Sequence, residues 1–133
     1  MITAVDSSAL IAIYMGESHS DRWMDLLVQS RSEGALVICD VVAAELFAVV
    51  QKRRVFDQVL QDLGLLVTQL SLDAACEAGH IFGQYRRLGG PRQFLIPDFL
   101  IGAFAMVDCD RLISADRGYL RKYFSGLNVL MAD

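Results

Sequence analysis

Five short apolar runs, separated by longer stretches with helical periodicity, constrain the fold of this chain more than any other feature of its sequence. The runs lie at residues 2–5, 35–38, 65–68, 112–114 and 127–131. Buried strands of this length that alternate with helices form a parallel sheet covered by helices on both faces. We therefore expect an α/β protein, with a three-layer α/β/α fold and a central, mostly parallel sheet of four to five short strands. Ligands of such sheets bind beyond the carboxyl ends of the strands.

Helix signals fill the intervals between these runs. Helices are expected at residues 8–15, 19–32, 41–53, 55–63, 72–88, 99–107 and 116–123. Asp40 and Ser71 stand where N-capping residues are needed, and Gly64 stands at a helix end. Residues 41–50 are apolar on every side apart from Glu45, which predicts a largely buried helix. No internal repeat or linker interrupts the 133 residues, so we expect a single domain over residues 1–133.

Charge and cysteine usage exclude several classes of protein. Twelve Lys and Arg against sixteen Asp and Glu give a net charge of −4, so a bulk attraction to nucleic acid is absent. No apolar run approaches the ~18 residues of a membrane span, and residues 1–6 do not resemble a signal peptide. The three cysteines form no C-x-x-C pair, which favours free thiols and a cytoplasmic protein. A hydrophobic content of 54% indicates that part of the surface packs against another protein.

Four acidic residues occupy positions that an apolar core does not favour. Asp6 directly follows the first strand and Asp116 follows the fourth, so the two are expected side by side at one edge of the sheet. Asp98 begins an apolar helix, and Glu45 interrupts another. Each of Asp6, Asp98 and Asp116 could instead be a helix cap or a first-turn acid, worth about 1 kcal/mol. Glu45 has no Arg or Lys within four residues, so its burial would require a cation or a proton.

Together, the four carboxylates predict a metal site. Converging carboxylates repel one another unless a cation lies among them, and oxygen ligands favour Mg²⁺ or Mn²⁺. Neither His19, in a polar segment, nor His80, on a helix, has the spacing of a zinc site, and no nucleotide-binding glycine loop is present. A carboxylate-held Mg²⁺ without such a loop favours phosphodiester hydrolysis. The basic residues near the acids could hold a nucleic-acid backbone or simply be solvated helix ends: Lys52, Arg53, Arg54, Arg86, Arg87, Arg92, Arg117, Arg121 and Lys122.

Four segments carry these acids along the chain: Val5-Asp6-Ser7-Ser8-Ala9-Leu10-Ile11, Ala43-Ala44-Glu45-Leu46, Ile96-Pro97-Asp98-Phe99-Leu100-Ile101-Gly102-Ala103 and Leu112-Ile113-Ser114-Ala115-Asp116. In order and spacing they resemble the PIN domain family, specifically its VapC-type toxin ribonucleases. The resemblance implies a PIN-like fold and a Mg²⁺-dependent endoribonuclease that hydrolyses RNA phosphodiester bonds as the toxin of a type II toxin–antitoxin pair. It further implies a homodimer and a cognate antitoxin as partners.

Residue by residue, the resemblance assigns roles at the site. The family's metal-site acids match Asp6, Glu45, Asp98 and Asp116. Ser114 matches a hydroxyl position that holds a carboxylate or a water molecule beside the metal. Ser7 matches a small hydroxyl residue next to the first acid. Gly102 stands where the family usually has Ala, which we interpret as a harmless packing variation.

Two other functions stay open for this sequence. One is a Mg²⁺-dependent phosphatase with Asp6 as nucleophile, although such enzymes usually have a second acid where this chain has Ser8. The other is a catalytically inactive PIN-like module that acts only by binding. The sequence does not name the RNA, the number of metal ions or the antitoxin, and it assigns no role to the loop at residues 89–93.

Overall fold

The structure, a computed structural model, describes residues 1–90, 94–115 and 118–132. Its centre is a sheet of five strands: β1 (Ile2–Val5), β2 (Ala35–Cys39), β3 (Leu66–Thr68), β4 (Arg111–Ile113) and β5 (Val129–Leu130). The strand order is β3-β2-β1-β4-β5, and every neighbouring pair is parallel. This arrangement confirms the α/β fold with a parallel sheet that the alternating pattern predicts.

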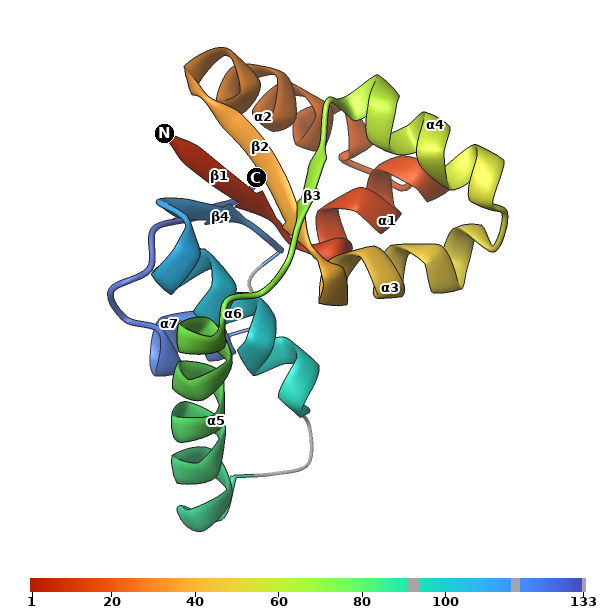
Figure 1. Cartoon of the computed structure of the whole chain (residues 1–133). Coiled ribbons are helices and arrows are strands. Elements are labelled where there is room, and N and C mark those ends of the chain that lie inside the picture. Colours follow the sequence, from red (N-terminus) through yellow and green to blue (C-terminus); the bar gives the residue numbers. More distant parts are fainter. Residues whose placement is uncertain (91–93, 116–117, 133) are drawn as a thin grey trace.

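Helices cover both faces of the sheet (Figure 1). They are α1 (Ser7–Met15), α2 (Ser20–Glu33), α3 (Asp40–Val50), α4 (Arg53–Leu63), α5 (Leu72–Arg87), α6 (Ile96–Asp108) and α7 (Tyr119–Tyr123). The chain moves from β1 outward to β3 and then returns to β4, on the other side of β1. Because crossovers between parallel strands are right-handed, this reversal places α1–α4 on one face and α5–α7 on the other. The crevice beyond the carboxyl ends of β1 and β4, where the order reverses, is where sheets of this kind bind ligands.

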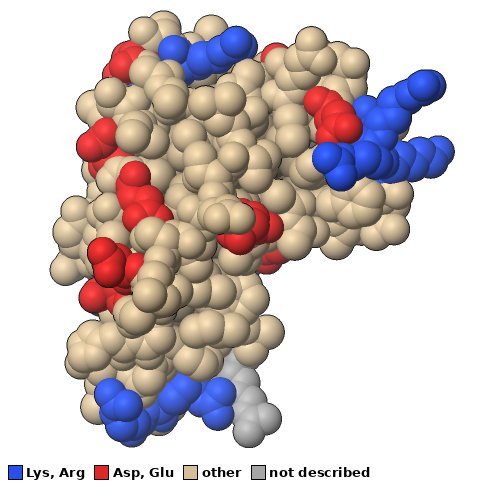
Figure 2. Space-filling model, viewed as in Figure 1, with Lys and Arg blue, Asp and Glu red and all other residues tan. Residues whose placement is uncertain are grey.

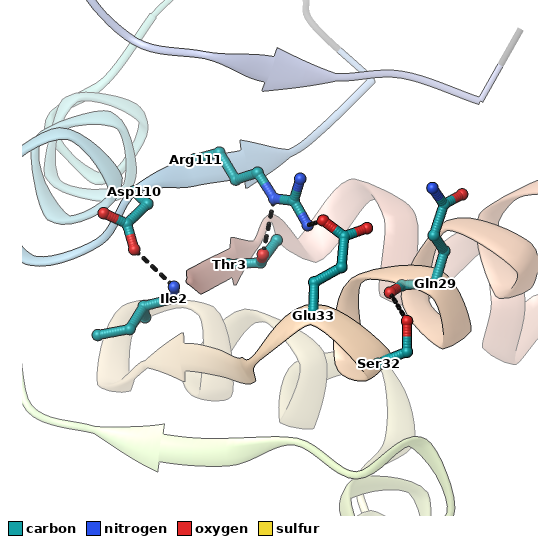
Figure 3. A network of polar contacts seen from close by, with 7 residues as sticks. All are labelled: Ile2, Thr3, Gln29, Ser32, Glu33, Asp110 and Arg111. Atoms are coloured by element: carbon teal, nitrogen blue, oxygen red, sulfur yellow. Dashed lines mark hydrogen bonds and ion pairs between the residues drawn. The ribbon is translucent and has the colours of Figure 1, made fainter.

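A polar network at the amino ends of β1 and β4 holds these two strands in register (Figure 3). The buried side chain of Arg111 donates to Thr3 Oγ1 at 2.9 Å and to Glu33 Oε2 at 3.2 Å. Asp110 Oδ2 accepts a hydrogen bond from Ile2 N at 2.6 Å. Such partners are required because an unpaired buried charge is strongly destabilising. With Thr3 opposite Arg111, the carboxyl ends of the two strands lie level.

The structure of α3 differs from the prediction at both ends and along one side. The helix begins at Asp40 itself, with Cys39 in the N-cap position, and it ends at Val50 rather than at residue 53. The prediction that this helix is largely buried is wrong, since Ala44 and Ala48 are exposed. An apolar sequence does not say how many sides of a helix have neighbours. Although α3 contacts the sheet and the helices α1, α4 and α6, the side that carries Ala44 and Ala48 is left exposed.

Other element ends agree with the sequence signals more closely. Ser71 caps α5, because its Oγ accepts a hydrogen bond from Ala74 N at 3.0 Å. Gly64 ends α4 with a φ of 69°, a left-handed conformation that glycine adopts without strain. The last helix is shorter than the predicted stretch of residues 116–123, since α7 begins at Tyr119. Asp116 lies outside the described residues.

Gly102 is not the harmless packing variation that the sequence suggests. A Cβ atom at this position in α6 would lie 2.6 Å from Cε2 of the Phe124 ring. Phe124 is 1% exposed, and its ring centroid lies 6.2 Å from that of Phe99 and 6.5 Å from that of Tyr119. The aromatic ring therefore occupies the space that the alanine side chain would need.

Candidate active site

Asp6 lies in the crevice between the ends of β1 and β4. It directly follows β1, its backbone N donates to the Ile113 carbonyl oxygen at 2.8 Å, and its exposed fraction is 0%. Ser114, the residue after β4, donates its hydroxyl to Asp6 Oδ2 at 2.7 Å. A carboxylate removed from water requires such donors. The ends of the first and fourth strands therefore lie side by side, as the sequence pattern predicts.

Ser8 brings a second hydroxyl to the same carboxylate oxygen. Its Oγ donates to Asp6 Oδ2 at 3.1 Å and accepts a hydrogen bond from Ala115 N at 3.3 Å. Ser8 thereby ties α1 to the segment that follows β4. Its part in the site was missed at the level of sequence, although one signal was present. A hydroxyl two residues after a strand-ending acid lies in the first helical turn, where it can bond back to that acid.

Ser7 joins Asp6 to Glu45. Its hydroxyl oxygen lies 2.9 Å from Glu45 Oε1 and 3.4 Å from Asp6 Oδ1, and the residue is 6% exposed. A serine hydroxyl carries a single proton, and the shorter distance assigns that proton to Glu45. Glu45, half-buried on α3, and Asp6, at the end of β1, therefore belong to one hydrogen-bonded site.

Asp98 lies in the first turn of α6 and is half-buried. Its Oδ2 accepts a hydrogen bond from Leu95 N at 2.9 Å. This contact is the stabilising first-turn role that the sequence also allows. Of the four predicted acids, Asp6 and Glu45 both lie within 3.4 Å of the Ser7 hydroxyl oxygen, and Asp116 lies outside the described residues.

The donor chemistry of this site suits a hard divalent cation. Carboxylate and hydroxyl oxygens are the ligands that Mg²⁺ and Mn²⁺ prefer. Within residues 1–90, 94–115 and 118–132, no three His, Cys, Asp or Glu side chains form a group that could hold a metal ion. His19 and His80 are exposed on the surface. The described part of the site supplies two neighbouring carboxylates, Asp6 and Glu45, so a cation there needs further ligands.

A hollow of about 420 Å³ opens beside these groups. Its lining residues are Ser7, Ser8, Ile11, Glu45 and Ala48. The exposed side of α3 forms one wall of the hollow. Ala48 is exposed because it lies on this wall. A ligand that enters meets Glu45 and the two serines, while the fully buried carboxylate of Asp6 lies beneath them.

A comparison with protein-family models identifies the class to which this architecture belongs. The model of the PIN domain matches residues 3–125. Because the match spans most of the 133 residues, the chain belongs to the PIN domain family. A comparison with curated proteins finds no significant match.

Several solved structures share the fold of this chain. VapBC2 from Rickettsia felis, solved with a DNA fragment of the promoter, superposes with a TM-score of 0.75 at 19% identity, over 100% of both chains. DNA-bound VapBC from Salmonella typhimurium has a TM-score of 0.66 at 17% identity, covering 100% of this chain and 99% of the other. A toxin–antitoxin complex from Klebsiella pneumoniae has a TM-score of 0.66 at 18% identity, covering 98% of each chain. At these identities the similarity establishes the fold.

Proposed function

We propose that this chain is a Mg²⁺-dependent endoribonuclease, also active with Mn²⁺, and the VapC-type toxin of a type II toxin–antitoxin pair. The observation that carries this proposal is the buried carboxylate of Asp6 at the point where the strand order reverses, linked through Ser7 to Glu45. Membership of the PIN domain family supports it. The fold shared with a protein solved as a toxin–antitoxin complex gives further support.

Asp6 and Glu45 would hold the metal ion, and we propose that Asp98 and Asp116 complete its ligands. When bound, such an ion supplies Lewis acidity that activates water and offsets negative charge on the phosphate oxygens of RNA. A second carboxylate of the set would accept the proton of the attacking water. The buried setting of Asp6 excludes bulk water from one side of the reaction centre.

The three serines would keep the two carboxylates in a productive orientation. Ser8 and Ser114 both donate to Oδ2 of Asp6, at 3.1 and 2.7 Å, so Oδ1 is the oxygen on the Glu45 side. Ser7 donates its hydroxyl hydrogen bond to Glu45 Oε1 and thereby orients that side chain toward Asp6. Hydroxyl donors of this kind hold a ligand in place without adding charge to the site.

A phosphatase with Asp6 as the covalent nucleophile fits this geometry less well. The Asp6 side chain is fully buried, and two hydroxyls already donate to its Oδ2. A nucleophile must reach its target in line, and donors that stabilise its negative charge reduce its reactivity. Ser8, at the position where such a phosphatase has its second acid, serves instead as one of these donors.

We also propose that the chain forms a homodimer and binds a cognate antitoxin. Support for a protein partner comes from the toxin–antitoxin complex that shares this fold. The surface also carries exposed apolar side chains, among them Met15 at 59%, Val28 at 64% and Val49 at 39% exposure. An antitoxin arginine that entered the hollow would meet the Glu45 carboxylate. Among the described residues, no helix is both long and apolar enough to cross a membrane. We place the toxin in the cytoplasm, where it would meet its RNA substrate.

Nuclease and phosphatase assays on the purified chain test this proposal. RNA cleavage is expected with Mg²⁺ or Mn²⁺ and not in EDTA, while a phosphomonoester such as p-nitrophenyl phosphate is left intact. Asp6→Asn is expected to abolish cleavage, whereas the matched control Asp40→Asn, at an exposed position on α3, retains it. Circular dichroism checks that both variants fold. Cleavage by Asp6→Asn at the wild-type rate, or cleavage in EDTA after contaminating nuclease is excluded, would refute the proposal.

A further inference from the structure

Basic side chains gather at the outer ends of two arms of this acidic protein. Figure 2 shows Lys and Arg at the far end of the α3–α4 arm and at the far end of α5, with a concave side of the molecule between them. The first group, here the α3–α4 cluster, consists of Lys52, Arg53 and Arg54. The second, the α5 cluster, consists of Arg86 and Arg87. All five residues are exposed.

The α3–α4 cluster follows a helix that carries one of the candidate acids, and the α5 cluster lies on a helix that packs against another such helix. The α3–α4 cluster follows α3. Val50, the last residue of α3, lies about 7.5 Å along the helix axis from Glu45 at 1.5 Å per residue. The α5 cluster ends the helix that packs most extensively against α6, whose first turn carries Asp98. The two arms diverge from the carboxyl edge of the sheet (Figure 1). The clusters therefore lie on either side of the approach to the site.

Helix stability does not explain the α3–α4 cluster. Arg53 and Arg54 open the first turn of α4, which contains no acidic residue, and Lys52 stands in the N-cap position. The positive end of the helix dipole makes cations unfavourable there, by about 0.3–1 kcal/mol each. The ion pair of Arg53 Nε with Asp57 Oδ1, at 2.9 Å, joins side chains that are 80% and 55% exposed, and such pairs stabilise little. Binding of an external anion would offset the electrostatic repulsion among these three adjacent cations and the amino end of α4.

A contact within α5 restrains one of the two arginines of the α5 cluster. The Arg86 guanidinium lies 5.9 Å from the centroid of the Phe82 ring, a cation–π contact that restrains its side chain. Arg87 is exposed beside it. Cations at a helix carboxyl end also stabilise the helix, so this cluster alone would not demand a ligand. Its position opposite the α3–α4 cluster gives it a second role.

On the basis of the function proposed above, we propose that the two clusters bind the phosphate backbone of a single RNA strand on either side of the candidate site at Asp6 and Glu45. Guanidinium groups match phosphate with paired hydrogen bonds. A protein with a net charge of −4 attracts RNA only through such local groups, because its overall field is repulsive. The clusters would thus hold the substrate strand over the acidic site, whose carboxylates alone would repel its phosphates.

Fluorescence anisotropy with a labelled single-stranded RNA in EDTA, where cleavage is absent, tests this assignment. The variants are Lys52→Ala with Arg54→Ala, and Arg86→Ala with Arg87→Ala. The matched control is Arg22→Ala with Arg31→Ala, which removes two exposed arginines from α2, a helix that lies apart from the far ends of both arms (Figure 1). Each phosphate contact to a single strand contributes ~0.7 to the slope of log Kd against log salt. Each cluster variant should lose about 1.4 of this slope, which amounts to about 25-fold weaker binding at 0.1 M salt.

The outcomes separate this inference from the proposed function. Wild-type protein that cleaves RNA, together with cluster variants that bind RNA as the control does, overturns the inference and leaves the nuclease in place. Wild-type protein that neither binds nor cleaves RNA would overturn both the inference and the proposed nuclease function. Cluster variants that keep RNA binding but lose a copurifying acidic protein would assign the clusters to that partner and also overturn the inference. The α3–α4 variant should melt no lower than wild type, because it removes cations from the amino end of α4.

Discussion

Replacement of Gly102 by alanine tests how tightly α6 packs beside the site. In an isolated helix this change stabilises by about 1 kcal/mol, because glycine is the weaker helix former. In this structure the new Cβ would lie 2.6, 2.8 and 2.9 Å from three ring carbons of Phe124. Carbon atoms in ordinary contact are about 3.5–4.0 Å apart, so the ring must retreat by about 1 Å. Phe124 is 1% exposed and packs on other aromatic rings, so it has little room to move.

The sign of the stability change follows from these two opposing contributions. Overpacking of a core costs about 1–3 kcal/mol, and the gain in helix propensity offsets about 1 kcal/mol of it. We expect Gly102→Ala to destabilise the protein by about 1 kcal/mol and to lower its melting temperature by about 4 °C. Thermal and urea unfolding monitored by circular dichroism measure both quantities.

A double-mutant cycle separates the clash from every other effect of the new methyl group. In a Phe124→Leu background the ring is gone, and the same Gly102→Ala change should become neutral or stabilising. A coupling free energy of about 1 kcal/mol or more between the two positions is expected. Should Gly102→Ala raise the melting temperature of the otherwise wild-type chain, or should the two changes add independently, the packing argument is incorrect.

Three further predictions concern the site, the cysteines and the strand register. Ser7→Ala should lower RNA cleavage at least about tenfold and weaken Mn²⁺ binding measured by electron paramagnetic resonance, because Glu45 loses its hydrogen-bond donor. Ser7→Thr, which keeps the hydroxyl, should retain both properties. Equal Mn²⁺ affinity of Ser7→Ala and wild type would contradict this. Burial, with a smaller contribution from Asp108, raises the pKa of the Cys109 thiol to about 12, so this cysteine carries almost no thiolate at pH 8. Iodoacetamide should therefore modify the exposed Cys76 first, as mass spectrometry of peptides would show. Rapid alkylation of Cys109 in the native protein would count against its burial. Arg111→Ala should destabilise the protein by about 2 kcal/mol or more in urea unfolding, because it removes two hydrogen bonds made by a buried cation. A change below about 0.5 kcal/mol would show that the network of Figure 3 does not hold β1 and β4 in register.

Sequence patterns predict the local structure of this chain well, since they record interactions between near neighbours. The apolar run at residues 2–5 becomes β1 with the same bounds, Ile2–Val5. Ser71 caps the helix that it precedes, through a hydrogen bond that spans three residues. Gly64 ends a helix where a left-handed residue is needed. Glu45 is recognisable as anomalous because it is the charged residue within an apolar helix, whatever the fold around it.

Sequence patterns alone predict the number of the strands and their order along the chain, the parallel sheet, and the acids that follow or interrupt its elements. The folded chain adds the contacts between side chains: where β1 and β4 lie side by side, the Ser114 hydroxyl donates to Asp6 although 108 positions separate them. The tertiary structure also decided that Ser7 reaches Glu45 across 38 positions, and that Phe124 fills the space beside Gly102. Periodicity and capping are properties of a single element, so they carry no information on which elements pack together. Hydrogen bonds and ring contacts between distant residues depend on that packing.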